Sequence, residues 1–401
     1  MTDRRFMRRA IELATAGIGN VSPNPAVGAV LVRDGRIIGE GYHREYGGPH
    51  AETDCIRDAR VRGEDPRGAV MYCTLEPCSF RSPTKHNPPC TESVIEAGIT
   101  RMIIAARDPN PAVAGCGVQA LRTAGIQTSC GLMEDQVLTL NESYFLSTAV
   151  RRPQVHLKWA QSLNGRIARA EGGKTPISGP EALRHSHGLR ATVDAILVGR
   201  ATVELDNPSL TARHGVSPAR QPLRVVLDPS LRTPISSQLF QDQAAKTLIL
   251  SGALNDESLT QAAALKRLGV EIVQLPVQEE GDFDPADILD ALYERGIRSV
   301  LVEGGSVTHT GFLAAGLWDR LTVYIGPTLL EGNVLAPDAP GPSIATVAHE
   351  VDVLGDTVAI TGMNPNTRRV LDGLKWETAP QPQTAGCVLP QEEAHVHRSS
   401  T

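Results

Sequence analysis

Three side chains in the first quarter of the sequence are of the types that bind zinc. His50, Cys78 and Cys90 offer one imidazole and two thiolates, and zinc prefers tetrahedral nitrogen and sulfur ligands. A catalytic zinc site keeps its fourth position for water, whose pKa then falls to about 7. Glu52 lies two residues after His50, where it can carry protons to a departing amine. The pattern predicts a zinc-dependent amine hydrolase, with a closed zinc site or buried thiols as alternatives.

The order of these residues is close to a known signature. Zinc nucleobase deaminases carry H-x-E followed by P-C-x-x-C. Residues 50–52 and 77–78 fit it, but eleven residues, 79–89, separate the two cysteines here. The remaining cysteines are expected to be small core thiols or, near the C-terminus, an incidental thiol: Cys55, Cys73, Cys116, Cys130 and Cys387.

The elements that must position these residues alternate between strands and helices. A strand at 26–32, a tight turn at Asp34-Gly35 and a second strand at 36–41 open the first unit. Periodicity then predicts helices and strands in turn, with His50 and Cys78 at helix starts. The expected helices are 6–16, 51–60, 91–97, 118–124 and 134–146, and the expected later strands are 70–75, 101–106 and 126–130.

A second α/β unit is expected after the basic junction at 151–153. Its expected strands are 155–159, 195–198, 223–227, 247–250 and 299–302, and its expected helices are 180–192, 261–268, 285–295 and 308–314. From Met363 onward Pro, Gln, Thr and Ser dominate without core-forming periodicity. We therefore expect domains at 1–150 and 151–362, and a disordered tail at 363–401.

Composition argues against several classes of function. The net charge of −6, with scattered Lys and Arg, lacks the basic patch of a nucleic-acid binder. No apolar run approaches the roughly 20 residues needed to span a bilayer. An odd number of cysteines and a charged N-terminus without an apolar signal region predict reduced thiols in the cytoplasm. We expect a small-molecule substrate, no nucleic-acid or membrane partner, and a homo-oligomer.

Ten short motifs resemble, in the same order, those of the bifunctional deaminase-reductase family of riboflavin biosynthesis. In the first half they are PNPAVG at 23–28, GYH at 41–43, PHAE at 49–52, TLEPCS at 74–79, PPC at 88–90 and DPNP at 108–111. In the second half they are SLNGR at 162–166, ILVG at 196–199, DNPSLTAR at 206–213 and VEGG at 302–305. The resemblance extends from Phe6 to about residue 360.

This resemblance implies a cytidine-deaminase-like three-layer domain followed by a dihydrofolate-reductase-like α/β domain. The first would bind Zn²⁺ and remove the 2-amino group of a diamino-ribosylaminopyrimidinone 5′-phosphate, with Glu52 as the catalytic residue. The second would use NADPH to reduce the ribosyl group to ribityl. The implied deaminase substrate residues are Asn24, His43, Asp108 and Asn110, the reductase substrate residues Arg190, Leu210, Arg213 and Glu303, and the cofactor residues Ala160, Thr202, Asp206, Gly305 and Ser306.

The residues themselves support part of this assignment. Arg190 and Arg213 could grip a phosphate through bidentate hydrogen bonds, and the glycines at 304–305 could present backbone N–H groups to dinucleotide phosphates. Each of these residues also fits an ordinary structural role. Arginine is usually a solvated surface charge, Asn among prolines makes turns, and glycine often only permits the backbone path.

Three features depart from the family pattern. The segment 80–87 is longer and rearranged, so either Arg81 or Lys85 would supply the cation for the sugar phosphate. Asn164 stands where aspartate is typical, and Pro176 replaces a tryptophan that would offer an aromatic surface to the cofactor. The alternatives are therefore a deaminase whose second domain only binds or stabilises, and a non-catalytic zinc-stabilised binding protein.

Overall fold

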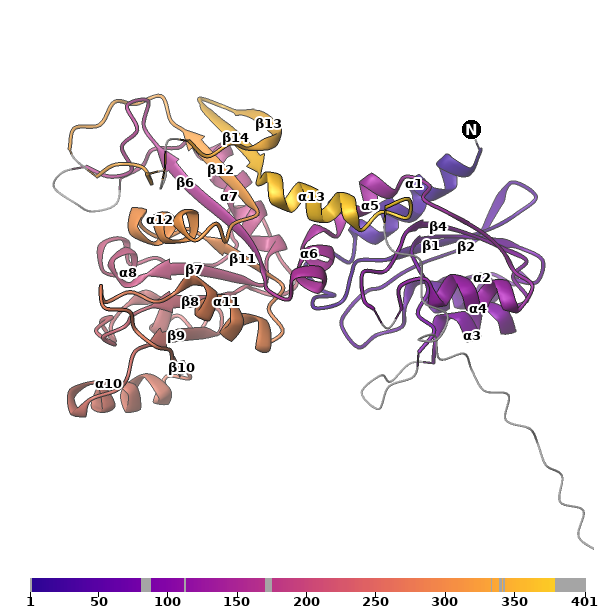
Figure 1. Cartoon of the computed structure of the whole chain (residues 1–401), viewed down its shortest axis with the longest axis horizontal. Helices are drawn as coiled ribbons and strands as arrows, with labels where there is room; N and C mark the ends of the chain where they lie inside the picture. Colours follow the sequence, from indigo (N-terminus) through magenta and orange to yellow (C-terminus); the bar gives the residue numbers. More distant parts are fainter. Residues whose placement is uncertain are drawn as a thin grey trace, which may run out of the picture. The chain divides into compact units, whose positions relative to one another are not determined.

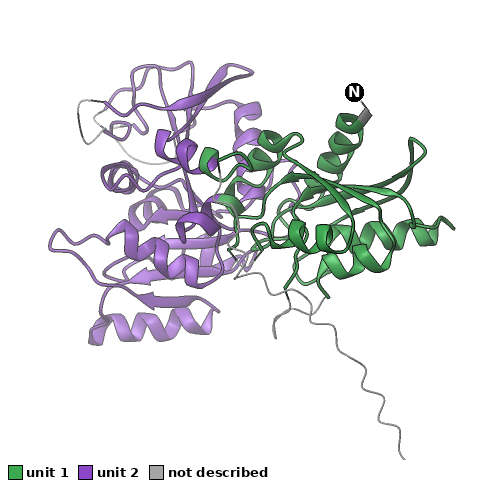
Figure 2. Ribbon diagram, turned by 45° about the vertical axis from the view of Figure 1, so that its right-hand side comes forward, with its two compact units in different colours: residues 1–145, 372–401 green, residues 146–371 purple. Residues whose placement is uncertain are grey.

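The computed structural model of the chain describes residues 2–80, 88–111, 113–169, 175–332, 334–338, 341 and 343–378. The chain forms two compact units (Figure 2), one of residues 1–145 with 372–401 and the other of residues 146–371. The division falls inside helix α6 (Glu142–Val150), slightly before the expected junction. Among the described residues, no helix is both long and apolar enough to cross a membrane.

Unit 1 is built on a five-stranded sheet in the order β2-β1-β3-β4-β5 (Figure 1). Strand β1 is antiparallel to β2 and β3, while β3, β4 and β5 are parallel. The strands are β1 (Gly28–Arg33), β2 (Arg36–Tyr42), β3 (Val70–Leu75), β4 (Arg101–Ala106) and β5 (Gln127–Cys130). Asp34 and Gly35 both have positive φ, at 50° and 73°, which confirms the predicted hairpin turn.

Helices cover the sheet of unit 1 in two layers, as the three-layer prediction requires. Helices α1 (Thr2–Thr15) and α5 (Glu134–Leu140) contact each other over strands β1 and β4. Helix α2 (Ala51–Val61) packs on β1 and β2 and contacts α3 (Cys90–Glu96), which contacts α4 (Cys116–Thr123). The α2 layer carries the candidate metal ligands.

The approach of helix α2 to strand β2 is unusually close. A Cβ atom placed on Gly41 would lie 2.2 Å from the backbone nitrogen of Cys55. Cys55 is fully buried in the interface between the helix and the sheet. A bare glycine backbone is therefore required for α2 to lie where it does.

The helix predicted over 134–146 is wrong as a single element. The helix ends at Asn141, between α5 and α6, and the Asn141 side chain bonds to the backbone of Ala26. Its Oδ1 accepts a hydrogen bond from the Ala26 N–H at 2.7 Å, and its Nδ2 donates to the Ala26 carbonyl at 2.9 Å. This pair anchors the chain just before β1 to the α5–α6 break. Cys116, expected to be a small core residue, is 7% exposed at the start of α4.

Unit 2 is built on a nine-stranded sheet in the order β10-β9-β8-β7-β11-β6-β12-β14-β13 (Figure 1). The first seven strands of this order, from β10 across to β12, are parallel to one another. Strand β14 is antiparallel to both β12 and β13. The strands are β6 (Gln154–Gln161), β7 (Ala195–Gly199), β8 (Leu223–Leu227), β9 (Thr247–Ser251), β10 (Glu271–Gln274), β11 (Ser299–Val302), β12 (Arg320–Ile325), β13 (Val347–Leu354) and β14 (Thr357–Met363).

Alternate residues of the parallel strands feed two separate apolar cores. Val155, Leu197 and Val302 belong to one, whereas Ile196 and Val198 belong to the other. The helices of unit 2 are α7 (Pro180–Thr192), α8 (Arg200–Asp206), α9 (Gln238–Gln241), α10 (Asp256–Arg267), α11 (Pro285–Glu294) and α12 (Ser306–Ala314), followed by α13 (Pro365–Gly373) at the end of the unit.

The tail expected from residue 363 is wrong over the residues that the structure describes. Helix α13 occupies Pro365–Gly373 and buries Thr367 and Leu371. After it, the Trp376 N–H donates to Glu134 Oε1 at 3.0 Å, and Lys375 pairs with Asp135 at 2.7 Å. A short helix with two buried residues leaves little periodicity to detect in the sequence. Residues 379–401 lie outside the described part.

Gly304 offers a test of how tightly the chain after strand β11 packs against strand β7. A Cβ at this position would lie 2.6 Å from Val198 Cα and 2.7 Å from the Gly199 nitrogen, and neither backbone atom can yield. We expect Gly304→Ala to lower the free energy of unfolding of unit 2 by at least about 2 kcal/mol. Scanning calorimetry measures the change.

The matched control is Gly188→Ala in helix α7, where an added Cβ would meet nothing within 4 Å. Alanine is the better helix former, so this variant should be neutral or more stable by up to about 1 kcal/mol. Equal stability of the two variants would contradict the packing described for Gly304.

Candidate metal centre and reductase cavity

The three candidate zinc ligands come from the ends of three different elements. His50 is the residue before helix α2, Cys90 is the first residue of α3, and Cys78 follows strand β3. His50 Nδ1 lies 3.2 Å from Cys90 Sγ and 3.6 Å from Cys78 Sγ. The Cys90 backbone N–H also points at Cys78 Sγ, at 3.3 Å. The prediction that these residues meet is confirmed.

The geometry of this cluster fits zinc. Tetrahedral bonds of about 2.3 Å to sulfur and about 2.0 Å to nitrogen would place those atoms about 3.5 Å apart. The observed separations of 3.2 and 3.6 Å bracket that value. Within the described residues, no fourth His, Cys, Asp or Glu joins the cluster. Three protein ligands are the pattern of catalytic zinc sites, whereas structural sites have four.

Glu52 lies beside the ligands in the first turn of α2, with 3% of its surface exposed. Burial raises the pKa of its carboxyl, while interactions with His50 and Cys90 oppose that rise. The carboxylate thus interacts with all three ligands, yet it is not a member of the ligand cluster. A buried carboxyl with a raised pKa is suited to taking up and releasing protons.

Two of the predicted substrate residues stand together beside His50. The His43 ring lies 5.4 Å from the His50 ring, measured between centroids, in an edge-on arrangement. His43 Nδ1 lies 3.0 Å from the Pro49 carbonyl, and its Nε2 lies 3.2 Å from Asn24 Nδ2. Burial lowers the pKa of His43, so the ring is neutral and its orientation is fixed by these two partners.

Asp108 and Asn110 form the other predicted part of the deaminase pocket. Asp108 Oδ1 accepts hydrogen bonds from the Asn110 N–H at 2.8 Å and from Tyr144 Oη at 2.9 Å. Burial raises the pKa of Asp108 to about 7, and the charge of Cys78 adds to that rise. Asp108 therefore lies close enough to the metal ligand Cys78 for the charge of that thiolate to affect its pKa. Arg81 and Lys85, the predicted phosphate cations, lie outside the described residues.

Glu76 is a residue that the sequence reasoning missed. It is 3% exposed, and its carboxylate accepts backbone hydrogen bonds from Gly115 at 2.9 Å, Val118 at 3.2 Å and Asp108 at 3.4 Å. Glu76 lies two residues before the metal ligand Cys78. Its hydrogen bonds thus connect the segment that carries this ligand to the loop that carries Asp108. A carboxylate followed by proline directly after an apolar strand was the available signal.

Unit 2 contains a cavity of about 1040 Å³. Eight of the nine residues predicted to bind its cofactor or substrate line this cavity: Ala160, Arg190, Thr202, Asp206, Arg213, Glu303, Gly305 and Ser306. Leu210 does not line it. Its side chain is 2% exposed and belongs to the apolar core around Ile196 and Val198. The cavity therefore brings together residues that are far apart in the sequence, as the resemblance implied.

A buried ion pair dominates one wall of this cavity. Arg190 donates from Nε and Nη2 to the two oxygens of Glu303, at 2.7 and 2.6 Å. Although burial alone would raise it, the pKa of Glu303 is held at about 2 by Arg190 and Lys158. Arg190 is thus already engaged, which is at odds with its expected use as a bidentate phosphate clamp. Arg213 is exposed, and among the described residues its guanidinium donates to Thr211 Oγ1 at 3.2 Å.

Lys158 is the second residue that the sequence reasoning missed. It lines the cavity from strand β6, and its Nζ lies 4.0 Å from Glu303 Oε2. Burial lowers the pKa of this lysine, and Glu303 opposes that effect. In the sequence Lys158 is the one charged residue of strand β6, whose other polar residues are Gln154, His156 and Gln161, and this charge is the signal that it offers.

Comparisons with known proteins identify the family of this chain. The cytidine and deoxycytidylate deaminase zinc-binding region matches residues 1–106, and the RibD C-terminal domain matches residues 153–350. The riboflavin biosynthesis protein RibD of Aquifex aeolicus is 40% identical over 362 residues, which cover 89% of this chain and 97% of that protein. The chain belongs to the RibD family. It is a riboflavin biosynthesis enzyme with a zinc-binding deaminase domain and an NADPH-dependent reductase domain.

Other RibD proteins agree in sequence and in fold. That of Escherichia coli is 38% identical over 344 residues, covering 83% of this chain and 90% of the relative. The crystal structure of a diaminohydroxyphosphoribosylaminopyrimidine deaminase/5-amino-6-(5-phosphoribosylamino)uracil reductase from Thermotoga maritima has a TM-score of 0.78 and 36% identity, covering 90% of this chain and 99% of that chain. The predicted pair of α/β domains is confirmed.

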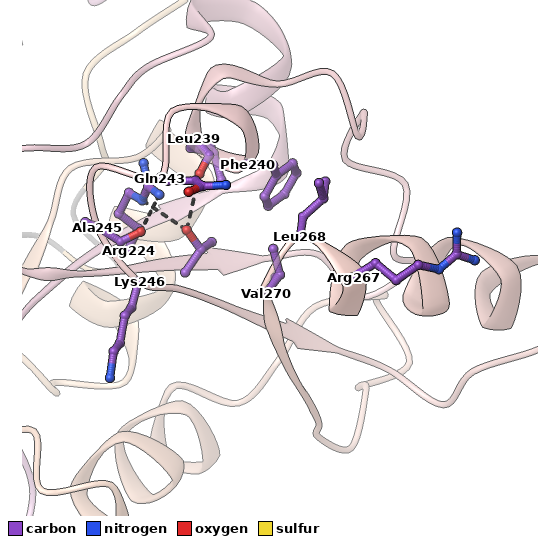
Figure 3. Close-up of a pocket in the computed structure, with 11 residues that line it drawn as sticks. Arg224, Leu239, Phe240, Gln243, Ala245, Lys246, Arg267, Leu268 and Val270 are labelled. Carbon is purple, nitrogen blue, oxygen red and sulfur yellow. Dashed lines mark hydrogen bonds between the residues drawn. The ribbon is translucent and has the colours of Figure 1, made fainter.

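A second cavity, of about 560 Å³, lies at the starts of strands β8 and β9 (Figure 3). Arg224 is 1% exposed at its base, and its guanidinium is bonded to Asp242, Thr247 and the backbone carbonyls of Ser209 and Ala245. Arg267 extends away from the other lining side chains. The guanidinium of Arg224 is already bonded to these partners. We therefore assign this cavity of the RibD reductase domain no ligand.

Removal of one ligand tests the metal centre. We expect Cys90→Ser to lower zinc affinity by at least about 100-fold, because the cluster has no described fourth ligand to compensate. Metal content after dialysis against a chelator measures the effect. Cys130→Ser, a reduced cysteine outside the cluster, is the control and should keep its zinc. Full zinc occupancy in Cys90→Ser would contradict the assigned site.

Proposed function

We propose that this enzyme acts on the two compounds named for the Thermotoga maritima relative. Unit 1 would deaminate a diaminohydroxyphosphoribosylaminopyrimidine, and unit 2 would reduce the resulting 5-amino-6-(5-phosphoribosylamino)uracil. The observation that carries the proposal is the three-ligand cluster with a buried carboxylate beside it and no fourth ligand among the described residues. The cavity of unit 2 supports the second activity.

The deamination exchanges an amino group for an oxygen, so water enters and ammonia leaves. When bound, zinc supplies a Lewis acid that lowers the pKa of water to about 7. Glu52 is proposed to accept the proton of that water and to deliver it to the departing nitrogen. Its raised pKa brings the two protonation states closer in energy at neutral pH, which both transfers require.

The remaining deaminase residues are proposed to hold the pyrimidine and its ribose. His43 and Asn24 form one fixed pair on the His50 side of the cluster. Asp108, oriented by Tyr144, and the neighbouring Asn110 form another pair near Cys78. Both pairs are oriented by hydrogen bonds before any substrate arrives, so they would position it at little entropic cost.

In unit 2, NADPH supplies the hydride when it is bound. The cavity lining supports a cofactor position beside the N-terminus of α12, where Gly305 and Ser306 present backbone N–H groups, with Thr202 and Asp206 of α8 nearby. Arg213 is proposed to bind the substrate phosphate in place of Arg190. Lys158 and Glu303, which line the same cavity, are proposed to face the ribosyl group.

A deaminase without hydride transfer is the alternative. Pro176 lines the cavity where the family has tryptophan, and Asn164 bonds the Leu330 backbone through both its oxygen, at 3.1 Å, and its nitrogen, at 2.9 Å. Asn164 thus connects two loops of unit 2. Purified enzyme given the deaminated intermediate and NADPH should oxidise the NADPH. Ammonia release without that oxidation would establish the alternative.

A homo-oligomer and a cytoplasmic location are also part of the proposal. Val351 and Val353 on edge strand β13 are 63% and 75% exposed, and β13 borders the sheet of unit 2. Exposed valines on an edge strand favour contact with a second copy of the chain.

Glu52→Gln tests the assigned proton carrier. We expect zinc content to stay at the wild-type level while ammonia release falls by at least about 100-fold, since general acid–base catalysis contributes about 10²–10⁴-fold. The control is Glu45→Gln, an exposed carboxylate in the loop before His50, which should release ammonia at the wild-type rate. Undiminished ammonia release by Glu52→Gln would refute the proton transfer.

A further inference from the structure

The Lys158 ammonium has two close partners among the described residues of the reductase cavity. Its Nζ lies 4.0 Å from Glu303 Oε2, the outer limit of an ion pair, because Arg190 occupies both oxygens of that carboxylate at 2.6 and 2.7 Å. The other interaction of its ammonium is with the ring of Tyr324, whose centroid lies 5.3 Å away. A desolvated ammonium over an aromatic face is a stabilising cation–π arrangement.

Tyr324 is held rigidly beneath the lysine. It lies on β12 opposite Ala160 of β6, two residues along the strand from Lys158, so both side chains project from the same face of the sheet. The ring is 1% exposed and packs against Ala182 and Ala359. Its Oη lies 2.7 Å from His185 Nδ1.

Helix α7 therefore supports Lys158 from two directions. Its His185 fixes Tyr324, and its Arg190 fixes Glu303. We propose that Tyr324, held by His185, is a positioning residue for the reduction: its ring fixes the place and the positive charge of the Lys158 ammonium in the cavity. This proposal rests on the reductase activity proposed above.

The groups around Lys158 set the expected pH dependence. Glu303 at the end of β11 and the Tyr324 ring on β12 favour the charged ammonium, whereas burial and Arg190 on α7 favour the neutral amine. His309 of α12 lies 3.1 Å from the Lys158 carbonyl, and burial together with the charge of Lys158 lowers the pKa of its imidazole. Removal of the ring should therefore lower the pKa of Lys158 further and move the alkaline decline of reductase activity to lower pH.

The test compares Tyr324→Leu with Tyr324→Phe, which keeps the ring and loses only the hydroxyl. Tyr324→Leu should lower reductase kcat/KM at least about tenfold and shift the alkaline limb of its pH profile downward by about one unit. Tyr324→Phe should lose less than about threefold. NADPH affinity and ammonia release, measured on the same samples, should not change in either variant.

Three outcomes would overturn the inference: a wild-type pH profile and kcat/KM in Tyr324→Leu, an equal loss in both variants, or a loss of NADPH affinity that accounts for the whole effect. Should Tyr324→Leu fail to fold, Tyr324→Met, which fills more of the core but carries no ring, replaces it. It should show the same losses as expected for Tyr324→Leu, and wild-type kcat/KM in that folded variant would equally overturn the inference. Wild-type enzyme that oxidises no NADPH would instead defeat the proposed reductase function.

Discussion

The close contact between helix α2 and strand β2 is the constraint on which the metal centre depends. Because Gly41 has no side chain, the backbone of α2 can lie directly against the strand. The N-terminus of α2 then delivers His50 to the point where Cys90 begins α3 and Cys78 leaves β3. Glu52 lies half a turn further along the same helix. The position of α2 therefore fixes both the ligand His50 and the proposed proton carrier.

The reductase domain depends in a similar way on one buried ion pair. Arg190 and Glu303 neutralise each other in a place where either charge alone would be strongly destabilising. Because these two charges pair with each other, Lys158 faces the cavity with the Glu303 carboxylate 4.0 Å away and the Tyr324 ring beneath it. Preorganised charge of this kind needs no rearrangement when substrate binds.

Much of the fold could be predicted from the sequence, and the failures have local causes. Strand β3 and helix α7 begin and end at the predicted residues, because one is a continuous apolar run and the other has a proline at its start. Strands β10, β12, β13 and β14 were missed. Of these, β13 is an exposed edge whose residues need no apolar alternation. The helix break at Asn141 depends on hydrogen bonds to Ala26, which is 115 residues away.

The sequence by itself determined the kinds of atoms available to this enzyme: one imidazole, two thiolates and a nearby carboxylate, in the order of the RibD family. Their types and local spacing are enough to indicate zinc chemistry, since ligand preference is a property of the atoms. Only the tertiary structure decided that Arg190 pairs with Glu303, that Leu210 is buried, and that Lys158 lies over Tyr324. Arg190 and Glu303 are 113 residues apart, and burial and charge pairing depend on distances that the order of residues does not contain.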